Sequence, residues 1–137
     1  TAITTVSREN RNGADSNEAS IRVTDGDTGT KFLLFDFNNP EWIQQEFAQG
    51  VRVTKYSLTS ANDAPGRDPV DWTLSGSNDG TNFTEIDSRT GQSFESRGQT
   101  REFLIINDTS YTYYRLDILA NGGDNLFQLA EWRLFAE

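Results

Sequence analysis

Residues 72–80 read Trp-Thr-Leu-Ser-Gly-Ser-Asn-Asp-Gly. Trp72, Leu74 and Gly76 alternate with small polar residues, and this period of two is typical of a strand with one buried and one solvent-facing side. The Asp79-Gly80 pair that ends the run is a strong signal for a β-hairpin turn. The stretch therefore predicts a strand that turns back within an antiparallel sheet.

Period-two segments recur along the chain. At residues 114–118, Tyr114, Leu116 and Ile118 share one face, while Arg115 and Asp117 share the other. Turn residues separate eight such segments, and we expect strands at residues 31–37, 42–48, 51–61, 69–77, 83–89, 100–106, 111–121 and 126–135. This spacing predicts an all-β sandwich or barrel around a core of Trp72, Leu74, Tyr114, Leu116, Ile118, Trp132 and Leu134.

Residues 39–41, Asn-Pro-Glu, leave one alternative open, because Asn followed by Pro is also typical of a helix start. Trp42, Ile43 and Phe47 do not form a helical stripe, and Gln49-Gly50 ends the run after two turns. We therefore favour a strand over residues 42–48.

The chain is acidic and has the length of a single domain covering residues 1–137. It carries 12 Lys and Arg against 21 Asp and Glu, a net charge of −9. Nucleic-acid binding needs clustered cations and is excluded, and attraction to anionic lipid is disfavoured for the same reason. The longest apolar runs hold four residues, far fewer than the roughly 20 that span a bilayer.

The absence of Cys and His removes several kinds of chemistry. Without Cys there are no disulfides, thiolate zinc sites or cysteine nucleophiles, and without His there is no imidazole base or metal ligand. No pair of acidic residues shows a recognisable catalytic spacing. We therefore expect a binding domain, not an enzyme.

Residues 25–30, Asp-Gly-Asp-Thr-Gly-Thr, concentrate oxygen donors in a short loop. Carboxylates, hydroxyls and backbone carbonyls at this density suit a hard cation such as Ca²⁺, which takes 6–8 oxygen ligands. The alternative is a turn in which Asp25 and Asp27 accept hydrogen bonds from their own backbone amides. The loop lacks the spacing and terminal Glu of an EF-hand.

An ordered set of motifs resembles a known family. Asp-Gly-Asp at 25–27, Trp42-Ile43, Asp68-Pro69, the segment 72–80, Tyr-Arg-Leu at 114–116 and Leu-Ala-Glu-Trp at 129–132 follow one another as in the discoidin or coagulation factor 5/8 type C domain. The bacterial branch of that family resembles family 32 carbohydrate-binding modules. The resemblance runs from about Ser16 to Phe135 and implies an eight-stranded antiparallel β-sandwich of the jelly-roll type.

The resemblance also implies one structural Ca²⁺. Its ligands would be Asp25, Asp27, Thr30, the carbonyl of Ala130, and Glu131. Glu131 stands in an otherwise apolar strand, where a buried unpaired carboxylate would be costly and a cation would remove that cost.

A sugar site on loops at one end of the sandwich is the second implication. Loop 62–68 offers Asn62, Asp63, Arg67 and Asp68 for hydroxyls, and loop 121–127 offers Asn125 and an aromatic ring, Phe127. We name Arg97, Trp42 and Phe94 as further candidates. Each has a structural alternative: Asp68 pairs with Arg67 or Arg97, and Phe127 begins a core strand. The lack of His departs from the common galactose-binding pattern.

The sequence thus predicts a non-catalytic, monomeric module that binds a neutral or cationic glycan or polysaccharide, with neutral sugars favoured, and that makes no membrane insertion. We expect it to belong to a longer bacterial protein, secreted or at the cell surface, such as a glycoside hydrolase, polysaccharide lyase or adhesin. The alternative is a protein-interaction or cell-adhesion domain of the same fold.

Overall fold

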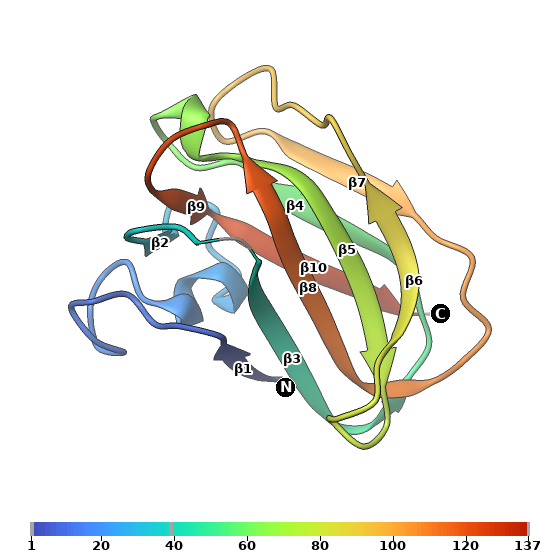
Figure 1. The fold of residues 1–137 in the computed structure, drawn as a ribbon. Helices are drawn as coiled ribbons and strands as arrows, with labels where there is room; N and C mark the ends of the chain where they lie inside the picture. The colour runs from blue at the N-terminus through green and yellow to red at the C-terminus, as the bar shows by residue number, and fades with distance from the viewer. Residues whose placement is uncertain (1, 39, 137) are drawn as a thin grey trace.

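Antiparallel strands make up most of the computed structural model, which describes residues 2–38 and 40–136. Figure 1 shows the five-stranded sheet in front, in the order β1 (Ile3–Val6), β3 (Glu41–Val51), β8 (Tyr111–Asn121), β5 (Pro69–Ser77) and β6 (Thr84–Arg89). Behind it lies the three-stranded sheet of β10 (Glu131–Ala136), β4 (Val53–Thr59) and β7 (Thr100–Leu104). The two layers form the predicted all-β sandwich.

Two short strands and two 3₁₀ helices complete the fold. Strands β2 (Phe32–Leu34) and β9 (Phe127–Leu129) pair with each other, and the 3₁₀ helices are η1 (Ser20–Thr24) and η2 (Pro65–Arg67). Among the described residues, no helix is long and apolar enough to cross a bilayer.

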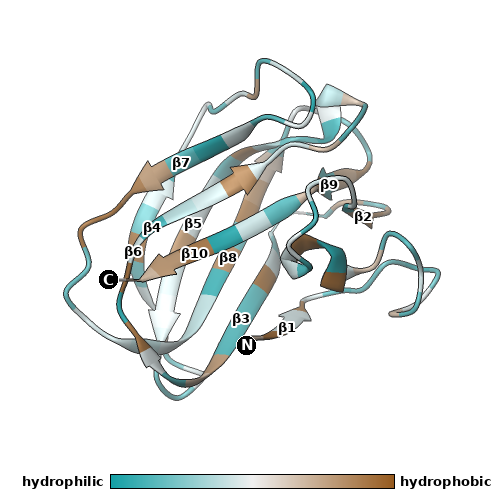
Figure 2. Ribbon diagram, turned by 180° about the vertical axis from the view of Figure 1, so that it is seen from behind, coloured by the Kyte–Doolittle hydropathy of each residue, from teal (hydrophilic) through white to brown (hydrophobic). Residues whose placement is uncertain are grey.

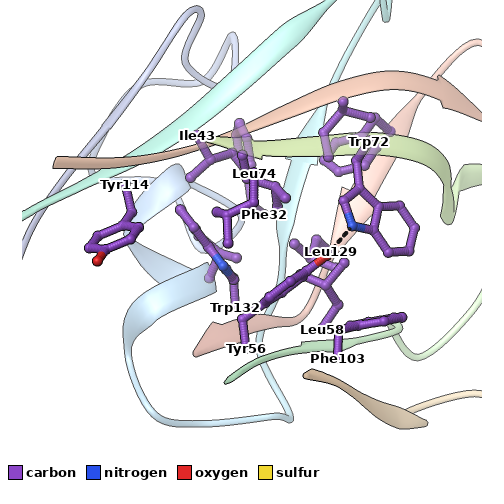
Figure 3. Close-up of a cluster of buried hydrophobic side chains, with 14 of the residues drawn as sticks. Phe32, Ile43, Tyr56, Leu58, Trp72, Leu74, Phe103, Tyr114, Leu129 and Trp132 are labelled. Carbon is purple, nitrogen blue, oxygen red and sulfur yellow. Dashed lines mark hydrogen bonds between the residues drawn. The ribbon is translucent and has the colours of Figure 1, made fainter. Parts of the chain in front are cut away.

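Two aromatic residues from opposite sheets join in the centre of the core. Trp72 on β5 donates its indole N–H to the Tyr56 hydroxyl on β4 at 2.8 Å, and the Tyr56 hydroxyl donates to Asp87 at 2.6 Å. Phe103 stacks on Tyr56 and meets Trp72 edge-on, as Figure 3 shows. Burial and the bond to Asp87 raise the pKa of Tyr56 above its ordinary value, so the hydroxyl stays a donor.

Eight strands are predicted and the described residues form ten, so the number of strands is confirmed only approximately. Residues 69–77 and 111–121 match β5 and β8. The strand at 42–48 is confirmed as part of β3, and Asn39 lies outside the described residues. The segment 126–135, expected to be one strand, is divided at Ala130 because its first part pairs with β2 and its second with β4.

The core differs from expectation at its edges. Trp72, Leu74, Tyr114, Leu116, Ile118 and Trp132 are buried as predicted, while Leu134 is only partly buried. In Figure 2, the far end of β7 is coloured hydrophobic, and Leu104 there is 77% exposed.

Candidate functional site

Three loops meet at the upper end of the molecule in Figure 1. They are residues 60–68, which contain η2, residues 90–99 between β6 and β7, and residues 122–126 between β8 and β9. Arg97 from the second loop binds both carboxylate oxygens of Asp68 in the first, at 3.0 and 2.5 Å. It also donates to the carbonyl of Asp63 at 3.2 Å. Two loops distant in sequence are thereby pinned together.

This ion pair involves two of the predicted glycan contacts. The Asp68 side chain is 6% exposed, and Arg97 occupies both of its oxygens. Each oxygen of Asp68 is thus used by Arg97 and little of its side chain is accessible, which is the structural alternative named for this pair, while 27% of the Arg97 side chain stays exposed.

The third loop packs directly on η2. The Asp124 amide donates to the Gly66 carbonyl at 3.2 Å. A Cβ atom at Gly122 would lie 2.9 Å from the Gly66 backbone, so only glycine permits this approach. The Asn121 side chain donates to the carbonyls of Asp124 and Leu126, at 2.9 and 2.7 Å, and fixes the shape of the loop.

Arg67 lies at the junction of the first and third loops with most of its hydrogen-bonding capacity unused. Its Nε lies 3.6 Å from Asp124 Oδ2, too far for a hydrogen bond, and is buried without a partner. The side chain is 26% exposed. A guanidinium carries five N–H donors, and in the described residues those of Arg67 make no hydrogen bond that the structure records. Arg67 therefore has donors to offer an oxygen-rich ligand.

Lys31 and Gln128 complete this end of the molecule. Lys31 Nζ donates to Asn62 Oδ1 at 3.1 Å and to Asp63 Oδ1 at 2.9 Å. Gln128, fully buried, donates to the Asp63 carbonyl, and its Oε1 has no partner. Hydrogen bonds from Lys31 and Gln128 hold the pKa of Asp63 below its ordinary range. The sequence signalled neither residue, because each acts through a long-range contact.

The predicted aromatic platform is wrong. Phe127 is 1% exposed and Phe94 is 6% exposed, since both rings fill the core. Phe37, which lies beside the third loop, is only partly buried, and its ring stacks on that of Phe127 at a centroid distance of 5.7 Å. Its amide donates to the Asn125 carbonyl at 2.8 Å. Phe37 is therefore the partly exposed ring beside these loops.

Trp42 does not lie on the loops at all. It stands within β3, where it pairs with Asp117 of β8. The guanidinium of Arg115 lies over its ring, 4.0 Å from the ring centroid. Its place in the middle of a sheet separates it from the other predicted contacts. Asn62, Asp63 and Asn125 are exposed on the loops as expected.

Of the predicted metal residues, Asp25, Thr30 and Glu131 are linked through the loop 25–30. Thr30 Oγ1 donates to Asp25 Oδ2 at 2.5 Å, and the Gly26 amide donates to Glu131 Oε2 at 3.1 Å. Asp25 also accepts from the Asp27 amide at 2.9 Å and Asp27 from the Gly29 amide at 2.8 Å, which is the turn geometry of the alternative. The loop thus contacts the start of β10 through Glu131.

Glu131 carries the clearest sign of an unmet charge. It is 2% exposed, and its Oε1 is buried without a hydrogen-bond partner. Burial raises the pKa of Glu131, and the charge of Asp25 raises it further. Arg133 offsets part of this by contacting Glu131 Oε2 at 3.3 Å and donating to the Gly26 carbonyl at 3.2 Å.

These residues fit a hard cation only with help from the backbone. The orphaned Glu131 oxygen and the nearby Asp25 supply carboxylates. No three acidic side chains gather into a metal-binding group anywhere in residues 2–38 and 40–136. A cation at this place would therefore depend on carbonyl oxygens for most of its ligands.

Residues 2–132 match the family model of the F5/8 type C domain. A curated relative, the peptide-N(4)-(N-acetyl-β-glucosaminyl)asparagine amidase of Arabidopsis thaliana, is 53% identical over 60 residues, or 43% of this chain. The chain spans about 8% of the length of that relative.

Solved structures share the fold over nearly the whole chain. A family 32 carbohydrate-binding module of Clostridium perfringens, in complex with GalNAc-β-1,3-galactose, has a TM-score of 0.83 at 21% identity, with 98% of this chain and 95% of that chain covered. Chitosan-binding module 1 from a Paenibacillus chitosanase/glucanase has a TM-score of 0.76 at 20% identity, covering 98% and 95%. At these identities the likeness establishes a common architecture.

Proposed function

Because the chain belongs to the F5/8 type C domain family, we propose that it is a non-catalytic module that binds a glycan on its end loops, with Arg67 as the main polar contact. The observation that carries the proposal is the state of Arg67: partly buried, held beside Asp124 at 3.6 Å, and rich in unused donors. Pairs of sugar hydroxyls accept hydrogen bonds from such a planar group.

The groups around Arg67 supply the rest of a sugar site. Asp124 and Asn62 offer acceptors and donors for further hydroxyls, and the partly exposed ring of Phe37 offers an apolar surface. The described residues contain no pocket, so a ligand would lie on the surface and remain well solvated. We expect affinities in the micromolar to millimolar range.

N-acetylhexosamine glycans are the first ligands to test. One structural neighbour was solved with GalNAc-β-1,3-galactose, and the plant relative is an amidase of N-acetyl-β-glucosaminyl asparagine. Both names contain a neutral, N-acetylated amino sugar. A neutral ligand also avoids repulsion from the net charge of −9.

We propose a structural Ca²⁺ as the second component. Asp25, Thr30, Glu131 and the carbonyls of Asp27 and Ala130 would hold it. When bound, the ion supplies positive charge that offsets the buried Glu131 carboxylate. Its role is to fix the loop 25–30 against β10, with no part in chemistry. The domain itself is proposed to act as a monomer within a longer extracellular protein.

Glycan retention tests the proposal directly. The wild-type domain and Arg67→Ala are run through affinity gels containing neutral, amino and acidic polysaccharides, and on an array of N-acetylhexosamine glycans. Lys55→Ala serves as the matched control, because it also removes one positive charge but lies on β4, paired with Glu102. We expect retention of wild type and Lys55→Ala and loss in Arg67→Ala. Retention on no glycan would refute carbohydrate binding and favour the protein-interaction function.

A further inference from the structure

The solvent-facing side of the five-stranded sheet carries an aromatic and acidic surface. Figure 1 looks onto this side, and no segment crosses in front of β3, β8 and β5. Register places Trp42 next to Asp117 and Asp117 next to Thr73 across three adjacent strands. We call these three residues and the neighbouring Arg115 and Phe83 the sheet-face cluster.

Arg115 is the cation of the sheet-face cluster, and its charge is already covered. The guanidinium lies 4.0 Å from the centroid of Trp42 and 4.2 Å from the centroid of Phe83. Its Nε and Nη2 both donate to Gln44 Oε1, at 3.0 and 2.8 Å. These contacts hold the two rings in fixed positions and leave Arg115 little capacity to neutralise another group.

Asp117 is in the opposite state. The structure records no hydrogen bond or ion pair to its carboxylate from any described residue, although the side chain is partly buried. Burial raises the pKa of Asp117, and the charge of Arg115 only partly opposes this. A carboxylate kept partly dehydrated without a donor reduces the stability of the fold. Such a group gains most from a cationic partner.

The acidic groups outnumber the cations on this side. Glu46 of β3 and Glu85 of β6 stand at register positions on the same face as Asp117 and Arg115, since Glu46 pairs with Tyr113 and Glu85 with Ser75. An ammonium group is attracted both by a carboxylate and by an aromatic ring face. The open sheet face suits an extended chain better than a single small molecule, because it offers several contacts in a row.

We propose that the sheet-face cluster is a second glycan-binding surface, specific for chains of hexosamine units with free amino groups. The apolar face of one sugar ring packs against Trp42, and its ammonium donates to Asp117. Thr73, which is partly exposed beside Asp117, is placed to contact a neighbouring hydroxyl. This surface differs from the loop site around Arg67 in position, in charge and in the class of sugar that it binds.

Tryptophan fluorescence reports on this surface selectively. Trp72 and Trp132 are 0% and 1% exposed, so Trp42 is the one tryptophan of three that a ligand can reach. Glucosamine oligomers are titrated into the wild-type domain at about pH 6, where an amine of this kind is protonated. We expect a saturable change in emission, and no change with N-acetylglucosamine oligomers of the same length.

Four variants separate this proposal from the loop site. Asp117→Asn should weaken binding of glucosamine oligomers at least about tenfold by calorimetry, and Trp42→Phe should remove the emission change. Arg67→Ala should leave both unchanged. Asp108→Asn is the matched control, since it removes the same charge from an exposed loop position. Circular dichroism confirms that each variant is folded.

Three outcomes would overturn the proposal. Equal weakening by Asp117→Asn and Asp108→Asn would mean nonspecific attraction to an acidic protein. Equal binding of acetylated oligomers would refute the amino-group requirement. Loss of binding in Arg67→Ala would assign the ligand to the end loops, which would leave the proposed function intact.

Discussion

Arg97 donates to both carboxylate oxygens of Asp68, at 3.0 and 2.5 Å, and so ties the loop 90–99 to the loop that presents Arg67. The two partners differ in exposure, with 27% of the Arg97 side chain but only 6% of the Asp68 side chain accessible. Charge on Arg97 is favoured by this contact, which raises its pKa. The ion pair therefore holds in place the loop that carries Arg67, the residue directly before Asp68 in the sequence.

Arg97→Ala should therefore destabilise the domain. It leaves Asp68 buried without a cation, and we expect a loss of about 2–3 kcal/mol in the free energy of unfolding, less than for a fully buried pair because Arg97 is partly solvated. Urea denaturation measures this change. In the double variant Arg97→Ala/Asp68→Asn, part of the loss should be recovered, because the unpaired charge is gone. A loss below about 0.5 kcal/mol in Arg97→Ala would show that the pair is a surface contact.

Leu116→Asp should abolish folding. Leu116 is 0% exposed on the central strand β8, and a buried unpaired carboxylate there costs several kcal/mol, a large part of the stability of a small domain. Leu104→Asp, at a position 77% exposed, is the control and should fold normally. Circular dichroism and thermal melting compare the two. A cooperative melt of Leu116→Asp near the wild-type temperature would contradict the assigned core.

The parts of this fold that sequence predicts are those governed by local periodicity. Strands β5 and β8 are read almost exactly, because both alternate apolar and polar residues and lie in the middle of a sheet. Strand β1 was missed because it is a short edge strand whose residues give no clear alternation. Its position depends on pairing with β3, which is a long-range contact.

The candidate site, like the fold, is predictable from sequence only where local residues decide it. Motif order located the loops that hold Arg67 and the loop 25–30, but it could not say which side chains are spent on internal pairs. The sequence alone does not distinguish Asp68 and Arg97 from residues that are free to bind a ligand. Only the tertiary contact shows that they bind each other. Phe127 was named as a ligand platform for a comparable reason, since only the pairing of β9 with β2 shows that its ring is turned inward.

Calcium should raise the melting temperature, and chelation should lower it. A ligand that binds only the folded state at a hundredfold excess over its Kd adds about 2.7 kcal/mol. Glu131→Ala should remove this response, whereas Arg133→Ala should enlarge it, because Arg133 competes for Glu131 Oε2. Differential scanning calorimetry with Ca²⁺ and with EDTA measures the effect. If both conditions give the same curve after elemental analysis has excluded a retained ion, the calcium proposal fails.

The pH dependence of stability should report the state of Asp117. Burial raises its pKa above the ordinary value of 3.8, so the folded state binds more protons than the unfolded state between the two pKa values. Its contribution to stability is thus complete below about pH 3.8 and is lost as the pH rises through the folded pKa. Asp117→Asn should be more stable than wild type at neutral pH, and the difference should shrink as the pH falls. Urea midpoints at a series of pH values test this. A difference that is constant with pH would contradict the shift.

Chemical-shift mapping by NMR tests the central claim most directly. A ¹⁵N-labelled domain is titrated with an N-acetylhexosamine disaccharide such as GalNAc-β-1,3-galactose, and the backbone amide shifts are followed. The account predicts saturable shifts concentrated in residues 62–67 and 122–126 and at Phe37, all lost in Arg67→Ala. Shifts confined to other parts of the chain, or no shifts with any glycan that the affinity gels retain, would contradict the assignment of the end loops as the glycan-binding site.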